Sequence, residues 1–381
     1  MLAAVALLTF LGILTITAVG PYLHPPNPGI GKRQLIYFAV AVACLVAFQA
    51  VDYRIIGTYA FVFYAASALL ILYTVVGSVV TVPGVTKRGG AYNWIDFGPF
   101  ALQPSELMKV AFVMVLARYL RWRSNYRTPA GLLPPFLLAA GPILLILKQP
   151  DLGTALIFIP TLFAMLYAAG AKGTHLLGVA GLALACGPLV WLCGLPGVPV
   201  FEHLPSLIKP YQRDRVFSMF SDDMETLQEG TGMQQYKALI AIGSGGIFGK
   251  GPMNIPNGQN IPEGENDMIF ALIAEQFGLF GSVVVVGAYA MIFVVAIEIG
   301  GSTREPFGRL VAVGVVAMLA GQAFVNLLVV TKLMPVTGVT LPFVSSGGSS
   351  LIASYMSIGL LLNVGQKRPI VMGKRVFEFE E

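Results

Sequence analysis

Long apolar runs alternate with short polar segments along nearly the whole chain. A helix needs about 20 mostly apolar residues to cross the hydrocarbon core of a bilayer, and the chain offers about ten runs of suitable length. We therefore predict an all-α polytopic membrane protein, a single membrane domain over residues 1–381. The predicted spans cover residues 1–20, 35–51, 57–78, 105–120, 132–147, 153–170, 174–194, 267–297, 309–330 and 347–364.

The composition supports this interpretation and limits where chemistry can occur. Hydrophobic residues make up 56% of the chain and charged residues 11%, whereas soluble domains carry about 25% charged residues. A large soluble catalytic domain is excluded, so any chemistry belongs to helix ends and loops. The net charge of +5 is typical of loop charges that orient membrane helices among lipids, and we expect no nucleic-acid partner.

The first apolar run has two interpretations. It ends in small residues near Ala18 and Gly20, as a cleaved signal peptide does. It is long, however, and no basic segment precedes it, which favours a retained span.

Basic residues indicate the orientation of the helices. With the N-terminus in the cytoplasm, the cytoplasmic loops contain more Lys and Arg than the short outer loops, as the positive-inside rule requires. Segment 118–127 and the C-terminal tail contribute many of them. We predict that both termini are cytoplasmic and that a long extracytoplasmic loop, residues 195–266, connects the seventh and eighth helices.

Four predicted helices then begin at the outer face, and each begins with a polar cluster. The clusters are residues 103–106, 149–154, 262–267 and 342–350. Any one of them could simply cap a helix, because Pro, Ser, Asp and Asn are common at helix starts. Four helix N-termini on one side would also supply free N–H groups and partial positive charge to an anionic ligand.

Two charged side chains lie near the start of the fourth predicted span. Glu106 and Lys109 are three residues apart, which places them on one face of a helix. One interpretation is a structural Glu–Lys pair or a lysine that reaches the membrane surface. The other, which we favour, is that Lys109 faces a polar cavity and pairs with a carboxylate from another helix.

Asp267 is the strongest candidate for that carboxylate. It stands where the polar segment 261–266 meets an apolar run, so it could be only a helix cap. Partial burial beside Lys109 could instead make it a general base. Glu275, two turns further along, is predicted to be a structural anchor between helices.

The long loop contains a second group of candidates. Arg213 and Arg215 stand beside Tyr211 and Gln212, and guanidinium groups bind phosphate oxygens in pairs; contact with lipid head groups is the alternative. Segment 241–251 is rich in glycine and contains Lys250, but Gly251 follows that lysine, so the segment is not a Walker A loop.

Taken in order, these motifs resemble the SEDS family (shape, elongation, division and sporulation) of bacterial membrane proteins. The resemblance extends over nearly the whole chain. Its motifs are segments 94–95, 103–109, 149–154, 211–215, 241–251, 262–270 and 335–350. Asn266 and Met268 differ from the residues that usually flank the family's acid, while Asp267 itself is kept.

The resemblance implies a peptidoglycan glycosyltransferase that polymerises lipid II at the outer face of the bacterial cytoplasmic membrane during cell elongation. It places Asp267 at the family's essential aspartate and Lys109 at the lysine thought to contact it. The expected substrate-binding residues are Ser105, Glu106, Asp151, Tyr211, Gln212, Arg213, Arg215, Lys250, Glu263, Ser345 and Ser346.

The resemblance also implies partners: lipid II, a growing glycan on undecaprenyl pyrophosphate, and a class B penicillin-binding protein. No soluble cofactor or dedicated metal site is expected, although a divalent cation could help to neutralise the pyrophosphate. A lipid II flippase and a non-catalytic scaffold are the alternatives. The gathering of polar clusters at one face, rather than at mid-membrane, favours the enzyme over the flippase.

Overall fold

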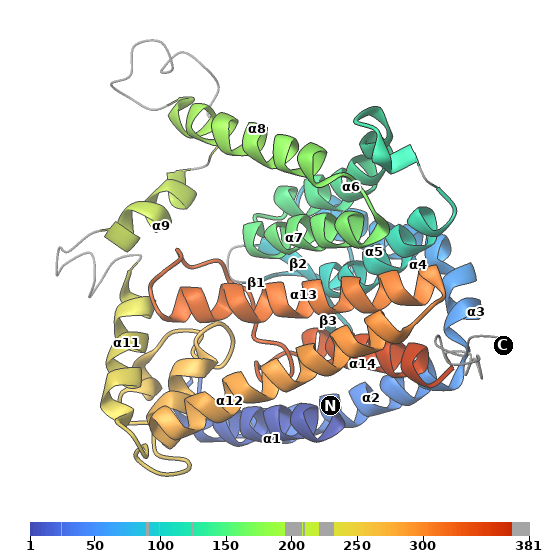
Figure 1. Ribbon diagram of the computed structural model, residues 1–381. Helices are drawn as coiled ribbons and strands as arrows, with labels where there is room; N and C mark the ends of the chain where they lie inside the picture. Colours follow the sequence, from blue (N-terminus) through green and yellow to red (C-terminus); the bar gives the residue numbers. More distant parts are fainter. Residues whose placement is uncertain are drawn as a thin grey trace.

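The predicted spans correspond to the long helices of the computed structural model (Figure 1). The structure describes residues 1–23, 25–88, 91–98, 100–123, 125–194, 208, 210–220 and 232–367; the side chains of Arg88, Pro210, Tyr211, Ser218 and Phe220 are not described. The long helices are α1 (Leu2–Val19), α2 (Ile30–Ala50), α4 (Ala60–Gly77), α5 (Pro104–Arg121), α6 (Leu133–Lys148), α7 (Leu152–Ala169), α8 (Gly173–Leu192), α12 (Ile269–Ser302), α13 (Pro306–Val330) and α14 (Gly348–Lys367).

Nine of these helices, within the described part of the chain, are long and apolar enough to cross a membrane. The exception is α5, which carries Glu106, Lys109, Arg118 and Arg121. It is nevertheless buried along most of its length and contacts α4 and α13. The predicted all-α polytopic class is confirmed, and the charged helix is enclosed by the others.

Several short elements occupy segments that the hydrophobic pattern left unassigned. A three-stranded antiparallel sheet precedes α5, formed by β1 (Val85–Arg88), β2 (Ala91–Asp96) and β3 (Ala101–Leu102) in that order. Helix α3 (Tyr53–Thr58) follows α2. Within the long segment 195–266 lie α9 (Pro210–Phe220) and α11 (Met233–Gly245).

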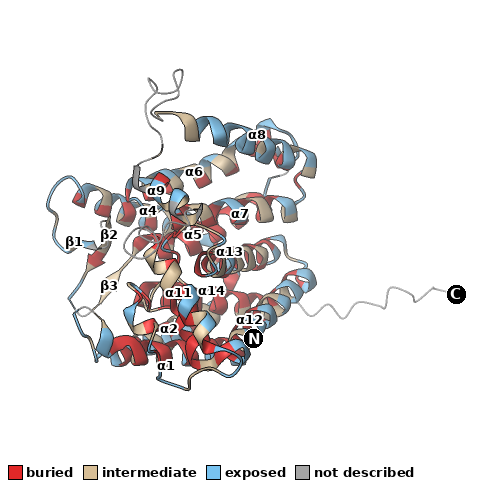
Figure 2. Cartoon of the chain, turned by 90° about the vertical axis from the view of Figure 1, so that its left-hand side faces the viewer, coloured by how far each residue is buried: buried red, intermediate tan, exposed pale blue. Residues whose placement is uncertain are grey.

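The centre of the bundle is formed by α13, α14 and α5, whose side chains are mostly buried (Figure 2). Helix α14 packs against α2, and α13 packs against α12, α7 and α5. By contrast, α8 lies apart from the other long helices, and Leu176 is its one buried residue. The exposed surface of α8 is apolar, as expected of a helix surrounded by lipid.

Helix α12 is broken at Gly278. Its 34 residues would extend about 50 Å as one straight rod, well beyond the hydrophobic thickness of a bilayer. Gly278 has φ 65° and ψ −158°, a conformation open to glycine because a Cβ would clash. Here a Cβ would stand 2.4 Å from the backbone nitrogen of Gly249.

The glycine-rich segment 246–251 supplies the hydrogen bonds that this break removes. The N–H of Leu279 donates to the carbonyl of Gly246 (2.9 Å), and the N–H of Gly251 donates to the carbonyl of Gln276 (3.0 Å). Non-helical backbone at membrane depth is stable only when such groups find partners. The glycines therefore allow close backbone contact with α12.

Glu275 anchors the same loop from within α12. Its side chain is fully buried, and its Oε1 accepts from Lys250 Nζ (2.7 Å), Ser244 Oγ (3.1 Å) and both nitrogens of Asn257, while Oε2 accepts from the N–H of Gly258 (2.7 Å). The predicted structural role of Glu275 is confirmed, although its partners come from the loop as well as a helix.

Changing Glu275 to Gln should destabilise the protein by about 1–3 kcal/mol, because an amide nitrogen cannot accept these hydrogen bonds and leaves buried donors without partners. The measurement is thermal unfolding in detergent. The matched control is Glu298→Gln, since Glu298 lies on the same helix and is exposed. An equal melting temperature for both variants would contradict the anchoring role.

Candidate active site

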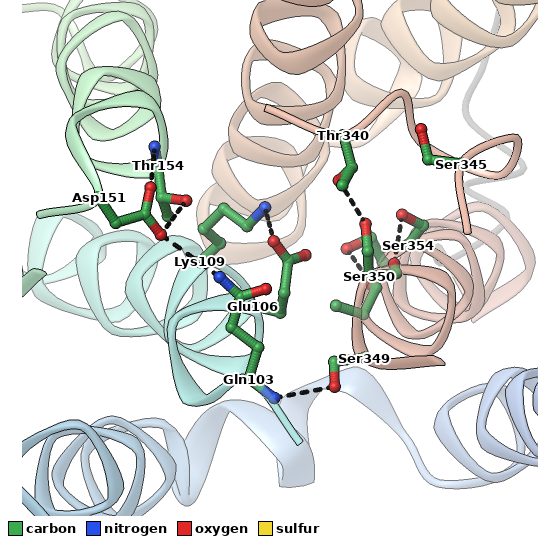
Figure 3. A network of polar contacts seen from close by, with 12 residues as sticks. Gln103, Glu106, Lys109, Asp151, Thr154, Thr340, Ser345, Ser349, Ser350 and Ser354 are labelled. Carbon is green, nitrogen blue, oxygen red and sulfur yellow. Dashed lines mark hydrogen bonds and ion pairs between the residues drawn. The ribbon is translucent and has the colours of Figure 1, made fainter. Parts of the chain in front are cut away.

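The starts of four helices are joined at one end of the bundle, which we call the polar end. The backbone N–H of Gln103 donates to Ser349 Oγ (2.9 Å), and its side-chain amide donates to Asp151 Oδ2 (3.3 Å), which links α5 to α14 and α7 (Figure 3). Ser345 Oγ donates to the carbonyl of Asn266 (2.6 Å), linking the α14 segment to the start of α12. The predicted convergence of these helix starts is confirmed.

Asp151 caps the start of α7 and also belongs to the polar end. It accepts from the N–H of Thr154 (3.0 Å) and from its hydroxyl (2.8 Å), as an N-cap does. Burial, offset in part by these hydrogen bonds, raises the pKa of the carboxyl group. Glu106 and Lys109 also act on it electrostatically, so Asp151 belongs to the same charged environment.

Asp267 lies in the turn just before α12, and its backbone is firmly held. Asn326, a fully buried side chain on α13, donates to the carbonyl of Asp267 (2.7 Å) and to that of Val339 (2.8 Å). A Cβ on Gly338 would stand 3.8 Å from Asp267 Oδ2. Among the described residues, none donates a hydrogen bond to the Asp267 carboxylate, which leaves its oxygens available to a ligand.

The surroundings of Asp267 change its acidity markedly. Burial raises the pKa of Asp267 to about 7, with a further increase from the nearby charge of Glu263. Arg215 opposes this shift, because a neighbouring cation stabilises the carboxylate. A carboxyl group with a pKa near 7 can accept a proton at neutral pH and release it again.

Lys109 does not make the contact that we expected. Its ammonium group donates to Glu106 Oε1 (2.8 Å) within α5, and both side chains are almost completely buried. Among the described residues, no ion pair joins Lys109 to Asp267, so the predicted direct pairing is wrong. The neighbour three residues away is already in reach and satisfies the buried charge at little conformational cost.

The two arginines of α9 have different partners. Arg213 is buried, and its guanidinium donates to the carbonyls of Trp191 (3.1 Å) and Cys193 (2.6 Å), which end α8. Arg213 is thus occupied in capping a helix, and its predicted contact with substrate is not supported. Arg215 donates to the carbonyl of Val336 (3.0 Å) and is the cation with the largest influence on Asp267.

Other predicted substrate-binding residues have structural partners. Lys250 neutralises Glu275, which explains why its ammonium is directed toward α12 instead of a ligand. Ser345 accepts from the N–H of Leu341 (2.7 Å) and so shapes the loop before α14. The backbone N–H of Ser346 donates to the carbonyl of Glu265 (2.9 Å).

The remaining candidates belong to α5, to α9 and to the loop before α12. Glu263 is exposed, with φ 52° in the left-handed region, which is strained for a residue with a side chain. Ser105 is buried, and its hydroxyl has no partner among the described residues. Gln212 is partly buried on α9, and the side chain of Tyr211 lies outside the described part.

Potential metal ligands are scattered in the structure. Within the described ranges, no three side chains of the His, Cys, Asp and Glu types are grouped so as to hold a metal ion.

Sequence reasoning missed two features of the site. Asn326 fixes the backbone of Asp267 from α13, and Gly338 borders its carboxylate. Asn326 could have been noticed, because a polar residue inside an apolar span commonly faces the bundle interior. Gly338 was noted only as part of a motif.

These features define an integral membrane protein with a titratable carboxylate at the end of a helix bundle, and comparisons with known proteins identify the family. The sequence profile of the FtsW, RodA and SpoVE family, described as cell cycle proteins, matches residues 1–369. The chain belongs to this family, which is the SEDS family, and the resemblance is confirmed.

Individual relatives from the family match over most of their lengths. Stage V sporulation protein E of Bacillus subtilis is 34% identical, over 88% of this chain and 86% of the relative. A probable peptidoglycan glycosyltransferase FtsW of Geobacter metallireducens is 33% identical, over 88% and 84%. The peptidoglycan glycosyltransferase MrdB of Escherichia coli is 28% identical, over 97% and 94%.

Solved structures share the fold. One chain of a peptidoglycan synthase complex, whose structure concerns the coordination of polymerization and crosslinking, has a TM-score of 0.77 and 30% identity over 96% of this chain and 97% of that chain. The rod shape determining protein RodA of Thermus thermophilus has a TM-score of 0.66 and 27% identity over 96% of each chain.

Proposed function

We propose that this protein is a peptidoglycan glycosyltransferase that joins the disaccharides of lipid II into glycan strands at the outer face of the cytoplasmic membrane. The observation that carries the proposal is the position of Asp267: its carboxylate has no hydrogen-bond donor among the described residues, and its pKa is raised to about 7. The names of the relatives supply the substrate class.

In the proposed reaction, an oxygen of Asp267 takes the proton from the 4-hydroxyl of the acceptor sugar. That hydroxyl oxygen forms the new bond to C1 of the donor sugar as the bond from C1 to the pyrophosphate breaks. The leaving pyrophosphate carries the released electron pair. Arg215 and the free N–H groups of the converging helix starts would stabilise its charge.

Glu106 and Lys109 would support this chemistry indirectly. Their buried ion pair lies beside Asp151, which in turn acts electrostatically on Asp267. We assign Lys109 the role of keeping the polar end hydrated and charge-balanced, in place of direct contact with the base.

The reaction rate should depend on pH through Asp267. Only the deprotonated form can accept a proton, so kcat/KM should rise as the pH increases through about 7, the raised pKa of Asp267. An unperturbed aspartate would instead lose activity only near pH 4. The measurement is the initial rate of polymerisation of labelled lipid II between about pH 5 and 9.

Two substitutions should move this midpoint in opposite directions. Arg215→Gln removes the cation that stabilises the carboxylate and should raise the midpoint, whereas Glu263→Gln removes a repelling charge and should lower it. Arg309→Gln, an exposed change in the first turn of α13, is the control for loss of a positive charge. Shifts in the same direction for both site variants would exclude Asp267 as the titrating group.

One assay separates the enzyme from the alternative functions. In detergent no transport across a membrane can be scored, so glycan polymer formed there from labelled lipid II identifies an enzyme. A flippase or scaffold would form none, with or without an added class B penicillin-binding protein. Absence of polymer under both conditions would contradict the proposal.

We further propose a role in cell elongation, two cytoplasmic termini and a class B penicillin-binding protein as partner. The elongation role is supported by the RodA-like form of segments 211–216 and 241–251. Complementation of strains depleted of their elongation, division or sporulation member tests this role, and rescue of a division or sporulation defect alone would overturn it. Reporter fusions to each terminus test the orientation.

A further inference from the structure

A groove of about 890 Å³ lies between the turn after α1 and the loop that leads to Asp267 and α12. Both segments are at the end of the bundle where α11 and α12 meet (Figure 1). The groove is lined by Tyr22, Asn27, Gln259, Asn260, Glu263 and Glu265, together with Lys237 and several prolines. None of these residues except Glu263 entered the mechanism above.

The groove and the reactive carboxylate share one rigid segment. Glu263 and Glu265 line the groove, and Asp267 follows two residues later. The N–H of Asp267 donates to the carbonyl of Glu263 (3.3 Å), and the carbonyl of Glu265 accepts from Ser346 (2.9 Å). Part of the groove wall is therefore formed by the same hydrogen-bonded turn that carries Asp267.

The charges in the groove exclude one part of the substrate. Among the described residues that line the groove, Glu263 and Glu265 outnumber the cation Lys237, whose ammonium donates to the carbonyl of Asn260 (3.1 Å). An anionic pyrophosphate would be repelled by this acidic excess. A neutral ligand, rich in hydroxyl and amide groups, suits the groove better.

The polar groups of the groove match such a ligand. Glu265 Oε2 is buried and has no hydrogen-bond donor among the described residues, so a ligand hydroxyl can donate a hydrogen bond to it. Asn27, Gln259 and Asn260 offer amides that both donate and accept. Tyr22, a residue that is 47% exposed, presents an aromatic ring against which an apolar sugar face can pack.

We infer that this groove is a saccharide subsite, which holds the neutral hydroxyl- and acetamido-bearing sugars of a glycan next to Asp267. The inference rests on the proposed function, because it assumes that the reacting ligand is a glycan. The volume is within the range of sites that bury small-molecule ligands and accommodates more than one sugar ring.

The test uses chitotriose, a soluble glycan of acetamido sugars that has no lipid and no phosphate. Binding to the full chain in detergent is measured by saturation-transfer NMR and by titration calorimetry. Tyr22→Ala and Gln259→Ala should each weaken binding, by about tenfold for loss of the aromatic ring. Tyr167→Ala is the matched control, because Tyr167 is an exposed aromatic residue on α7.

The outcomes distinguish this inference from the proposed function. Asp267→Asn should bind chitotriose as the native chain does, even without polymerising lipid II. In the polymerisation assay, Tyr22→Ala should raise KM and leave kcat nearly unchanged. Failure of the native chain to bind chitotriose at about 10 mM, or native affinity in both groove variants, would overturn the saccharide subsite. Neither result would contradict the proposed polymerase activity.

Discussion

Asp267→Asn should lower the rate of lipid II polymerisation by about 10²–10⁴-fold, the usual contribution of a general base. The amide has nearly the same shape but cannot accept the proton. The fold should be kept, because Asn326 holds Asp267 through its backbone carbonyl (2.7 Å), which the substitution does not change. Polymer length and initial rate are measured for the purified variant.

Thermal unfolding provides the necessary control for this variant. Burial raises the pKa of Asp267, which means that the charged form is disfavoured in the folded protein. Its neutral replacement should therefore unfold at the same temperature or higher. A stable Asp267→Asn protein that polymerises at the native rate would show that another group accepts the proton.

Lys109→Ala should destabilise the protein by about 3–5 kcal/mol, because it leaves the carboxylate of Glu106 buried without its counter-charge. The ammonium and the carboxylate are 2.8 Å apart, and both side chains are about 95% buried or more. The expected effect is a large fall in unfolding temperature in detergent, accompanied by loss of activity.

A double variant separates stability from function. Glu106→Gln combined with Lys109→Met removes both charges and should recover most of the lost stability, since replacing a whole buried pair is often nearly neutral. We expect this protein to fold and still polymerise slowly, because the polar end has lost its buried cation. Full activity in the double variant would reduce the pair to a structural role.

The arrangement of helices could be predicted well from the sequence, because apolar length and turn residues determine where a chain can cross a bilayer. All ten predicted spans have a helical counterpart, with ends that differ by a few residues. The convergence of four helix starts could also be predicted, because every second helix begins on the same side of the membrane. The small sheet β1–β2–β3 could not be predicted, because its strands are short and only partly buried.

Side-chain pairing was less predictable, because it depends on contacts distant in the sequence. The pattern placed Lys109 and Asp267 in one region but could not show that Glu106 would take the ammonium. Arg213 was predicted to bind phosphate, but its guanidinium donates to the carbonyls that end α8. A sequence lists charged side chains, whereas the competing backbone acceptors become visible only in the fold.

The break at Gly278 divides α12 into two parts with different contacts. The stretch after the break crosses the bundle with α13, while the stretch before it is fastened to the loop by Glu275 and leads directly from Asp267. A pair of spectroscopic labels on either side of Gly278 would read the bend angle itself. Such a pair could follow the reacting segment during turnover against a reference fixed in the lipid.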